Sequence, residues 1–298
     1  MRQKTSLLLI FFLAFSLYGC VNESKKKEAD ILAQKADSIN KERIEYLLPS
    51  PQELMSFVKD EGLAYKENLV YPLEDIEKIN LFRNQALYFG VYFCDFYYLS
   101  VFEKNTQSLK YLATLRQLSV KLGIEHLFKE SFFKRMEDNY SNLDSLKAIS
   151  VELSSSVFNS LDQTDNNMLF SIIGIGSIVE SLYLTSSSIT DVKSQTHLVS
   201  SVYDIGEFYE NFFSSFLVFC NDEPSLKPLL NDLTSIREIL QQGKVGKDNT
   251  PTATKKIDSK GVKVKISDGS KVSANEANFN LLKNKVNSIR TKIVNQQY

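Results

Sequence analysis

The sequence has no tryptophan and few glycines, prolines, cysteines and histidines. Its 298 residues include 11 Gly, 6 Pro, 3 Cys and 2 His. Scarce Gly and Pro disfavour a turn-rich all-β fold and favour helices. Because His126 and His197 are the only histidines, a His-rich metal site is excluded, and we expect neither a metal site nor a cofactor.

Neither sign of charge is in excess. The chain carries 35 Lys and Arg against 36 Asp and Glu, a formal net charge of -1. Nothing in it resembles a basic face that would neutralise several phosphates, which binding to nucleic acid requires. We therefore expect no nucleic acid partner.

An apolar run from Leu7 to Leu17 lies near the N-terminus, behind Arg2 and Lys4. About a dozen residues are too few to cross a bilayer, which takes roughly 20. A positive region followed by a short apolar region is typical of a signal peptide. We therefore predict that residues 1–19 are a signal peptide that is removed.

The run ends on Leu17-Tyr18-Gly19-Cys20, which resembles the lipobox of bacterial lipoproteins. Leu17 is aliphatic and Gly19 is small, as that motif requires, although Tyr18 is bulkier than usual. The resemblance implies that Cys20 carries several acyl chains, palmitate among them, and holds the protein on a membrane, since each buried methylene adds about 0.8 kcal/mol. An ordinary secretory peptide with a coincidental cysteine is the alternative.

Residues 20–47 form a polar, helix-prone segment that contains Lys25-Lys26-Lys27. A helix of this length would reach roughly 35 Å at 1.5 Å per residue. We interpret it as a stalk that lifts the body off the membrane, with contact between the lysines and anionic headgroups as the alternative. Surface-exported lipoproteins of Bacteroidota, which the N-terminus resembles, would have an acidic cluster here. Only Glu23 precedes the lysines, so we expect an outer-membrane location facing the periplasm.

The helical body is expected to occupy residues 48–241. Ser50 can cap a first helix, with Glu53 completing a capping box. Together with the segment from Gly90 to Asp95, this region resembles an uncharacterised family of helical lipoproteins from Bacteroidota over roughly residues 48–220. The resemblance implies an all-helical envelope protein, and that family carries no assigned activity from which functional residues could be transferred.

The segment from Asp75 to Phe102 is the most hydrophobic part of the mature chain and is apolar on nearly every face, which predicts a central buried helix. A transmembrane span is the alternative. Asp95 would cost about 2.5–3.5 kcal/mol in a bilayer, so we favour a core helix. Ala86, Gly90 and Cys94 recur at intervals of four and predict a small-residue stripe for close helix packing.

A second apolar helix is predicted at Met168–Leu184, with its own small-residue stripe at Gly174, Ser177 and Ser181. Its Glu180 and Tyr183 lie 85 residues after Asp95 and Tyr98, with a leucine following each tyrosine, which suggests two related helical units. The Gly174-Ile175-Gly176 sequence lacks the strand, third glycine and lysine of a phosphate-binding loop. Close helix packing explains these glycines better.

Asp95 and Glu180 are the candidate ligand-binding residues, together with Tyr98 and Tyr183. A carboxyl group in an apolar helix must be paired, hydrogen-bonded or protonated. If the two helices cross, the four side chains would form a polar pocket for a cation, a polar ligand or a peptide amine. Alternatively, each acid accepts a hydrogen bond from a neighbouring Tyr, Ser or Lys as a buried structural contact.

Cys94 and Cys220 remain once Cys20 is acylated. An oxidising envelope would permit a disulfide between them. Both lie in helix-like apolar runs, which favours two buried thiols instead. No sequence motif around either cysteine, or around any serine, points to a catalytic nucleophile.

Further amphipathic helices are predicted at Leu109–Leu122, Leu127–Met136, Leu143–Phe158, Val199–Cys220 and Leu226–Leu240. Residues 242–272 are polar and predict a flexible linker, in which Asp268-Gly269 permits a small hairpin. A capping box at Ser273 and Glu276 is expected to open a C-terminal amphipathic helix over 273–298.

The C-terminal helix has an apolar seam, at Phe279, Leu282, Val286, Ile289 and Ile293, surrounded by basic residues. This seam would dock on the body, pair with another copy, or bind a protein partner. Docking is the default expectation.

These patterns together predict an all-α fold: a bundle of antiparallel helical hairpins with a flexible link to a C-terminal amphipathic helix. The predicted role is non-enzymatic binding or scaffolding by a lipid-anchored cell-envelope protein. A carrier of an apolar ligand in the aromatic core, and an enzyme using Asp95 and Glu180 as acid and base, are the alternatives.

Overall fold

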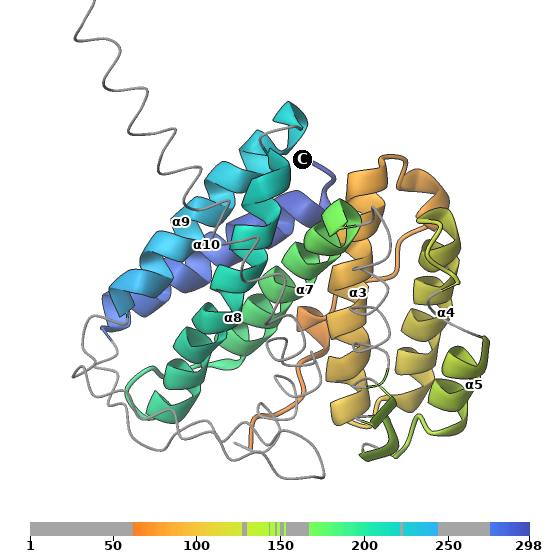
Figure 1. Cartoon of the computed structure of the whole chain (residues 1–298). Coiled ribbons are helices and arrows are strands. Elements are labelled where there is room, and N and C mark those ends of the chain that lie inside the picture. Colours follow the sequence, from red (N-terminus) through yellow and green to blue (C-terminus); the bar gives the residue numbers. More distant parts are fainter. Residues whose placement is uncertain are drawn as a thin grey trace, which may run out of the picture. The chain divides into compact units, whose positions relative to one another are not determined.

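The computed structural model describes residues 62–126, 130–142, 144–146, 148–149, 152, 167–220, 223–243 and 275–298. The regular elements in these parts of the chain are all helices and include no strand, so the all-α prediction is confirmed (Figure 1). The elements are η2 (Glu67–Leu69), η3 (Ile76–Lys78), α3 (Phe82–Val101), α4 (Asn105–Lys121), α5 (Glu130–Asp138), α7 (Asn167–Ser188), α8 (Thr196–Cys220), η4 (Pro224–Leu226), α9 (Lys227–Gly243) and α10 (Glu276–Val294).

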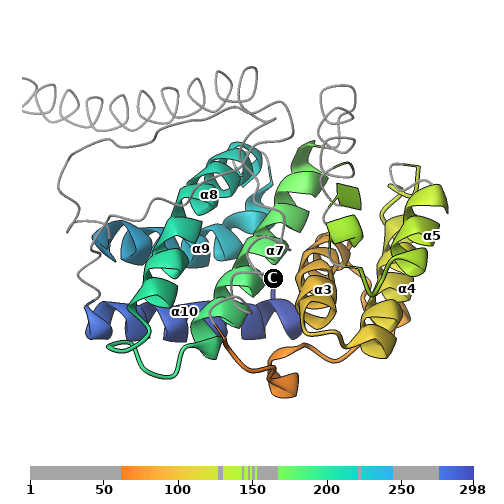
Figure 2. The same cartoon turned by 90° about the horizontal axis from the view of Figure 1, so that it is seen from below.

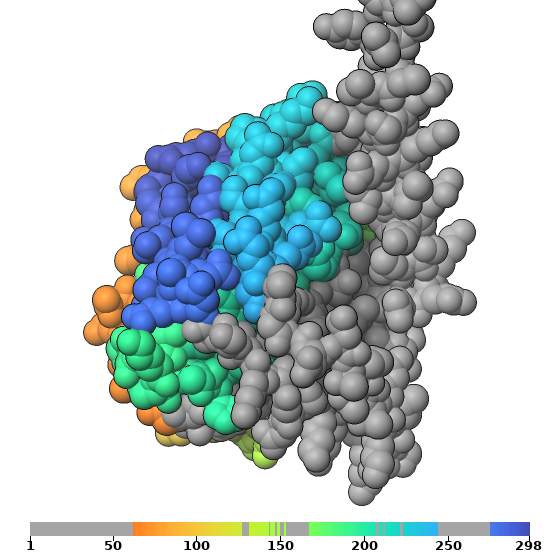
Figure 3. Space-filling model, turned by 90° about the vertical axis from the view of Figure 1, so that its left-hand side faces the viewer, coloured from red at the N-terminus to blue at the C-terminus, as the bar shows by residue number. Residues whose placement is uncertain are grey.

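The most extensive helix pairing is between α3 and α7, which are far apart in the sequence. α4 packs on α3, and α8 packs on α7 (Figures 1 and 2). α10 lies against α7, α9 and, at its C-terminal end, α3. Figure 3 shows α9 and α10 side by side on one face of the molecule. The α3–α7 pair is therefore the centre of the bundle.

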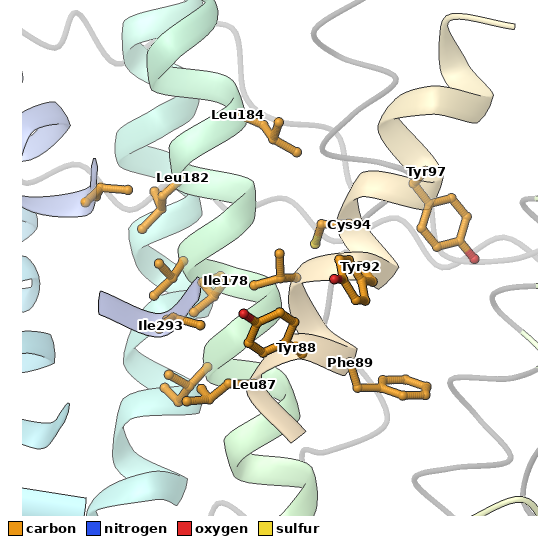
Figure 4. Packing of buried hydrophobic residues seen from close by; sticks show 14 of the residues in the cluster. Leu87, Tyr88, Phe89, Tyr92, Cys94, Tyr97, Ile178, Leu182, Leu184 and Ile293 are labelled. Carbon is orange, nitrogen blue, oxygen red and sulfur yellow. The ribbon is translucent and has the colours of Figure 1, made fainter. Parts of the chain in front are cut away.

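Burial explains the composition of α3. Sixteen of its 20 residues are buried, including Tyr88, Tyr92 and Asp95, because α7 covers one side of the helix and α4 another. Figure 4 shows Cys94 pointing toward α7, whereas Phe89 and Tyr97 point away from it. A helix enclosed in this way has no solvent face, which explains why its sequence is apolar on nearly every side.

Glycines bring the backbones of α3 and α7 into contact. A Cβ atom on Gly90 would lie 2.2 Å from the carbonyl oxygen of Ile173, and one on Gly176 would lie 2.3 Å from that of Leu87. No real side chain fits at such distances. The two helices therefore cross at their backbones, and the prediction that Gly176 serves close helix packing is confirmed.

The two small-residue stripes face each other over most of their length. Cys94 Sγ donates to the carbonyl oxygen of Ser177 at 3.1 Å and lies 3.3 Å from Ser181 Oγ. Gly174 departs from the predicted stripe, because a Cβ there would lie 2.1 Å from the ring of Phe212 on α8. Cys94 and Cys220 are both free buried thiols, as the favoured interpretation had it.

α7 is long and apolar enough to cross a membrane by length and composition alone, and within the described residues it is the one helix that meets these criteria. In this fold 72% of its most apolar window is buried. α3, Phe212 and α10 cover it in place of lipid. The structure thus gives α7 the role of a core helix.

The C-terminal helix docks on the body. Phe279, Leu282, Val286, Ile289 and Ile293 are each at most 1% exposed, so the whole predicted seam is buried inside the molecule. The expected capping box is wrong in detail: α10 begins at Glu276, and Asn275 is the N-cap, its side chain accepting from the backbone N–H of Ala277 at 3.0 Å. Asn275 is short enough to reach this donor, as N-cap residues are.

Several predictions fall outside the described residues. These are the signal peptide, the acylated Cys20, the stalk, the helix opened by Ser50, most of the Leu143–Phe158 helix, and the linker with its hairpin. The other helices occur near their predicted positions. α4 ends before Gly123, whose φ of 68° suits a glycine after a helix C-terminus, and α9 extends to Gly243 instead of ending at Leu240.

The backbone contact between α3 and α7 predicts that Gly90→Ala destabilises the fold. The new Cβ would collide with the backbone of α7, and we expect a loss of about 2 kcal/mol or more in the free energy of unfolding, measured with denaturant. Gly206→Ala is the matched control, since its Cβ would lie 3.4 Å from Leu240 Cδ2, at the end of a side chain instead of against backbone. Similar unfolding free energies for the two variants would refute the close-contact explanation.

Candidate functional site

A buried ion pair joins α7 to α10. Arg290 Nε lies 3.0 Å from Glu180 Oε2, and Arg290 Nη2 lies 3.2 Å from Glu180 Oε1. The side chain of Glu180 is 0% exposed and that of Arg290 is 11% exposed. Two parallel N–H···O bonds are the strong geometry for a guanidinium and a carboxylate, and burial protects this pair from screening by salt.

Two tyrosine rings flank the guanidinium. Its central carbon lies 4.4 Å from the ring centroid of Tyr183 and 5.0 Å from that of Tyr71, which are cation–π distances. Arg290 Nη2 also donates to the carbonyl oxygen of Leu69 at 3.3 Å. Arg290 therefore ties α10 to α7 and to the irregular segment before α3.

Asp95 completes the cluster from α3. It is 0% exposed, and its Oδ2 accepts from the backbone N–H of Tyr71 at 3.1 Å. Its carboxyl group also interacts electrostatically with that of Glu180 on α7. Within the described residues, Oδ1 of Asp95 has no hydrogen-bond partner. Two buried carboxyl groups that interact in this way are strongly unfavourable when both are ionised, so the arrangement favours a proton on one of them.

The pKa directions agree with one proton on Asp95. Burial raises the pKa of Asp95 well above its ordinary value, and the neighbouring Glu180 raises it further. Burial also raises the pKa of Glu180, but Arg290 opposes that shift by its charge and its hydrogen bonds. Glu180 is thus the ionised partner of Arg290, and Asp95 is the proton donor between the acids.

Hydroxyl groups of buried tyrosines form hydrogen bonds with the backbone of the segment from 62 to 81, which has little regular structure. The Tyr98 hydroxyl accepts from the backbone N–H of Lys66 at 3.0 Å, and the Tyr92 hydroxyl accepts from that of Glu74 at 2.8 Å. Tyr111, on α4, donates to the carbonyl oxygen of Tyr71. These hydroxyls satisfy backbone groups that a helix or a sheet would otherwise satisfy.

The structure brings together three of the four predicted site residues. Asp95, Glu180 and Tyr183 lie around Arg290, whereas the Tyr98 ring packs against Tyr65 and Phe102, with centroids 5.7 and 4.9 Å away. The Tyr98 hydroxyl accepts from the backbone N–H of Lys66 and makes no contact with Arg290 in the described structure. Arg290 itself, and Tyr71, were missed by the sequence reasoning.

The geometry favours a structural contact over an open pocket. Both acids are fully buried, and the cation between the tyrosines is the chain's own Arg290. Catalysis by acid and base would require one of the carboxyl groups to reach a substrate. Among the described residues no group of three or more His, Cys, Asp and Glu side chains is arranged to hold a metal ion.

A second polar cluster fixes the C-terminal end of α10. Asp232, on α9, accepts from Lys285 Nζ at 2.9 Å and from Tyr298 Oη at 2.6 Å, and it pairs with Lys292. Burial alone would raise the pKa of Asp232, but the hydrogen bonds from Lys292, Tyr298 and Lys285 prevail and lower it to about 2. α10 therefore has one anchor on α7 and another on α9.

Comparisons with models of protein families, with curated proteins and with solved structures find no match to this chain. The resemblance to helical lipoproteins therefore stays a prediction from the sequence. The candidate site has to be interpreted from its own geometry.

The buried ion pair predicts a large effect of Arg290→Met. Removing the cation leaves a buried acid pair without a counter-charge. We expect the free energy of unfolding at neutral pH to fall by about 3–5 kcal/mol. The loss should shrink toward pH 5, since protonation can then neutralise the acids. Arg135→Met is the matched control, because Arg135 and Glu152 form an exposed pair worth at most about 1 kcal/mol. Equal losses in denaturant titrations would contradict the assignment.

The Asp232 cluster predicts an acid-sensitive anchor. Its folded pKa of about 2 is below the ordinary value for Asp, so its stabilisation is present above about pH 4 and disappears as the pH falls toward 2. Thermal unfolding of the wild type between pH 5 and 2 should show this loss. Asp232→Asn should lower the melting temperature at pH 5. The difference in melting temperature between variant and wild type should be smaller at pH 2. A difference that does not change with pH would argue against the anchor.

Proposed function

We propose that this chain is a lipid-anchored cell-envelope protein whose helical body has a non-enzymatic binding or scaffolding role. The observation that carries the proposal is the apolar run that ends on Leu17-Tyr18-Gly19-Cys20 behind Arg2 and Lys4. Acylation of Cys20 would hold the body at a membrane, with residues 20–47 as its stalk and the periplasmic face of the outer membrane as its location. We also propose that the chain is related to the helical lipoproteins of Bacteroidota that its sequence resembles.

The interior of the body supports binding or scaffolding over the alternatives. An enzyme using Asp95 and Glu180 would need these acids accessible, but both are 0% exposed, behind Arg290 and Tyr71. A carrier would need room among its aromatic side chains. The rings of α3 instead pack on one another, as Tyr88 does on Tyr92 at 5.5 Å and Phe96 on Tyr97 at 5.1 Å. A role exerted through the outer surface fits this interior best.

We restrict the proposed protein partner at the 279–293 seam to a state in which α10 is detached from the body. The seam is buried against the body, with Arg290 in the ion pair and Lys285 and Lys292 on Asp232. A partner would reach it only after α10 had left the body. The exposed faces of the helices are therefore the surfaces that we assign to binding.

The lipid anchor is tested by changing its acceptor atom. Cys20→Ser should abolish incorporation of a palmitate analogue and move the protein from the membrane to the soluble fraction, since serine provides no thiol for acylation. Cys220→Ala, which removes a buried thiol, should incorporate the label like the wild type. Retention of label and membrane association by the Cys20→Ser variant would show that the anchor is elsewhere.

The binding role is tested by affinity capture of the acylated protein from its native envelope, followed by mass spectrometry of proteins and small molecules. We expect a stoichiometric protein partner with the wild type that is reduced in the Cys20→Ser variant, because the anchor brings the body to its partner. Recovery of a tightly held small molecule without a protein would favour the carrier alternative.

A further inference from the structure

The cluster at the junction of α3, α7 and α10 contains two carboxyl groups and one guanidinium. Glu180 accepts both hydrogen bonds from Arg290, and Asp95, on α3, is 0% exposed with its Oδ1 unpartnered among the described residues and interacts electrostatically with Glu180. We propose that Asp95 and Glu180 share a single proton which locks α10 and the 62–81 segment onto the α3–α7 pair, so that rising pH loosens this junction. The lock goes beyond the proposed function and does not depend on the lipid anchor.

Charge balance gives the proton its importance. With a proton on Asp95, the cluster holds one negative and one positive charge and is neutral. Without it, the same buried volume holds two negative charges against one positive charge. A buried charge without a partner is strongly unfavourable, and two carboxylates in contact repel each other. The proton is therefore a structural component of the junction.

Among the described residues, Arg290 is the one cation that acts electrostatically on Asp95. Besides Arg290, the groups that interact electrostatically with Asp95 are acidic or neutral: Tyr65 and Tyr71 from the segment before α3, Tyr92, Tyr98 and Cys94 from α3, Tyr111 from α4, and Glu180 and Tyr183 from α7. Burial raises the pKa values of the phenols and the thiol, so they stay neutral at working pH. None of these groups would replace the charge of a proton lost from Asp95.

The contacts identify which segments the proton holds. Asp95 accepts from the backbone N–H of Tyr71, while Arg290 donates to the carbonyl oxygen of Leu69. The segment before α3 and the helix α10 therefore meet on the same acid pair. Repulsion between the acids acts on both segments at once, and it acts little on α5, which packs on α4 away from the junction.

The sign of the pH dependence follows from the linkage between protonation and folding. The folded pKa of Asp95 is raised, so between about pH 4 and that folded pKa the folded chain binds up to one proton more than the unfolded chain. The stabilisation is complete below that pH and is lost as the pH rises through the folded pKa. One proton changes the opening equilibrium by at most about tenfold per pH unit.

Asp95→Asn is the direct test on the full mature chain. The amide keeps the shape of the acid, accepts from Tyr71 through its oxygen and donates to Glu180 through its nitrogen, as the protonated acid does. Hydrogen–deuterium exchange of α10 amides is measured for both proteins between pH 5 and 9. Comparing the two at each pH cancels the intrinsic pH dependence of exchange.

We expect the ratio of wild-type to variant exchange rates in α10 to increase with pH, by up to tenfold per unit above the pKa of Asp95. Exchange in α5 should show a smaller ratio. Asp191→Asn, a change at an exposed acid that bonds Ser194, should leave the α10 ratio constant over this range. A constant ratio for Asp95→Asn, or the same trend with Asp191→Asn, would overturn the proposal.

A measurement on the wild type needs no variant and keeps the proposal testable if Asp95→Asn does not fold. The infrared C=O stretch of a protonated carboxylic acid should be present at neutral pH, when ordinary Asp and Glu side chains are ionised. It should disappear as the pH rises over the interval in which α10 exchange accelerates. Absence of the protonated-acid band at neutral pH would refute the shared proton.

Discussion

Two acids and one arginine are buried together where α3, α7 and α10 meet. The contacts around them offset the free energy that is lost when these charged groups leave water. Glu180 and Arg290 are paired through two hydrogen bonds, and Asp95 is held between Glu180 and the backbone of Tyr71. A buried charge cluster is weak evidence of stability by itself, because desolvation offsets the attraction. Its members come from α3, α7 and α10, so these three helices have to meet in one arrangement for the cluster to be satisfied.

Close packing of the helices brings together the segments that carry the acids. Gly90 and Gly176 let the backbones of α3 and α7 touch, and Asp95 and Glu180 follow these glycines by five and four residues. About one turn beyond the glycine contact, Cys94 still contacts Ser177 and Ser181 across the pair, so the adjacent Asp95 and Glu180 belong to the same helix junction. The acids then need a counter-charge, which α10 supplies. The docking of α10 is therefore an electrostatic requirement of the α3–α7 pair as well as burial of its apolar seam.

Much of this architecture was predictable from the sequence because it depends on local periodicity. The buried helices, the stripes at Gly90, Cys94, Ser177 and Ser181, and the seam of α10 were all read from spacing. The convergence of Asp95 with Glu180 was proposed from the matching positions of two acids in apolar helices. These patterns are visible because a buried face constrains every third or fourth residue.

The parts that were not predicted depend on contacts between distant segments. Arg290 stands among several basic residues of α10, and nothing local distinguishes it from Lys283 or Lys292. Its partner lies 110 residues away. Tyr98 was assigned to the acids by its spacing, but the backbone of the irregular 62–81 segment takes its hydroxyl. That segment has no periodic sequence pattern from which its contacts could have been predicted.

The most direct test of the shared-charge cluster is a double-mutant cycle with Asp95→Asn and Glu180→Gln, followed by denaturant unfolding at neutral pH. If either acid can act as the counter-ion of Arg290, each single variant keeps one acid for the cation, and the double variant keeps none. We predict that the double variant loses at least about 1.5 kcal/mol more than the sum of the single losses, within the range of coupled neighbours. Additive losses would contradict the account, because they would mean that the two acids do not share the charge of Arg290.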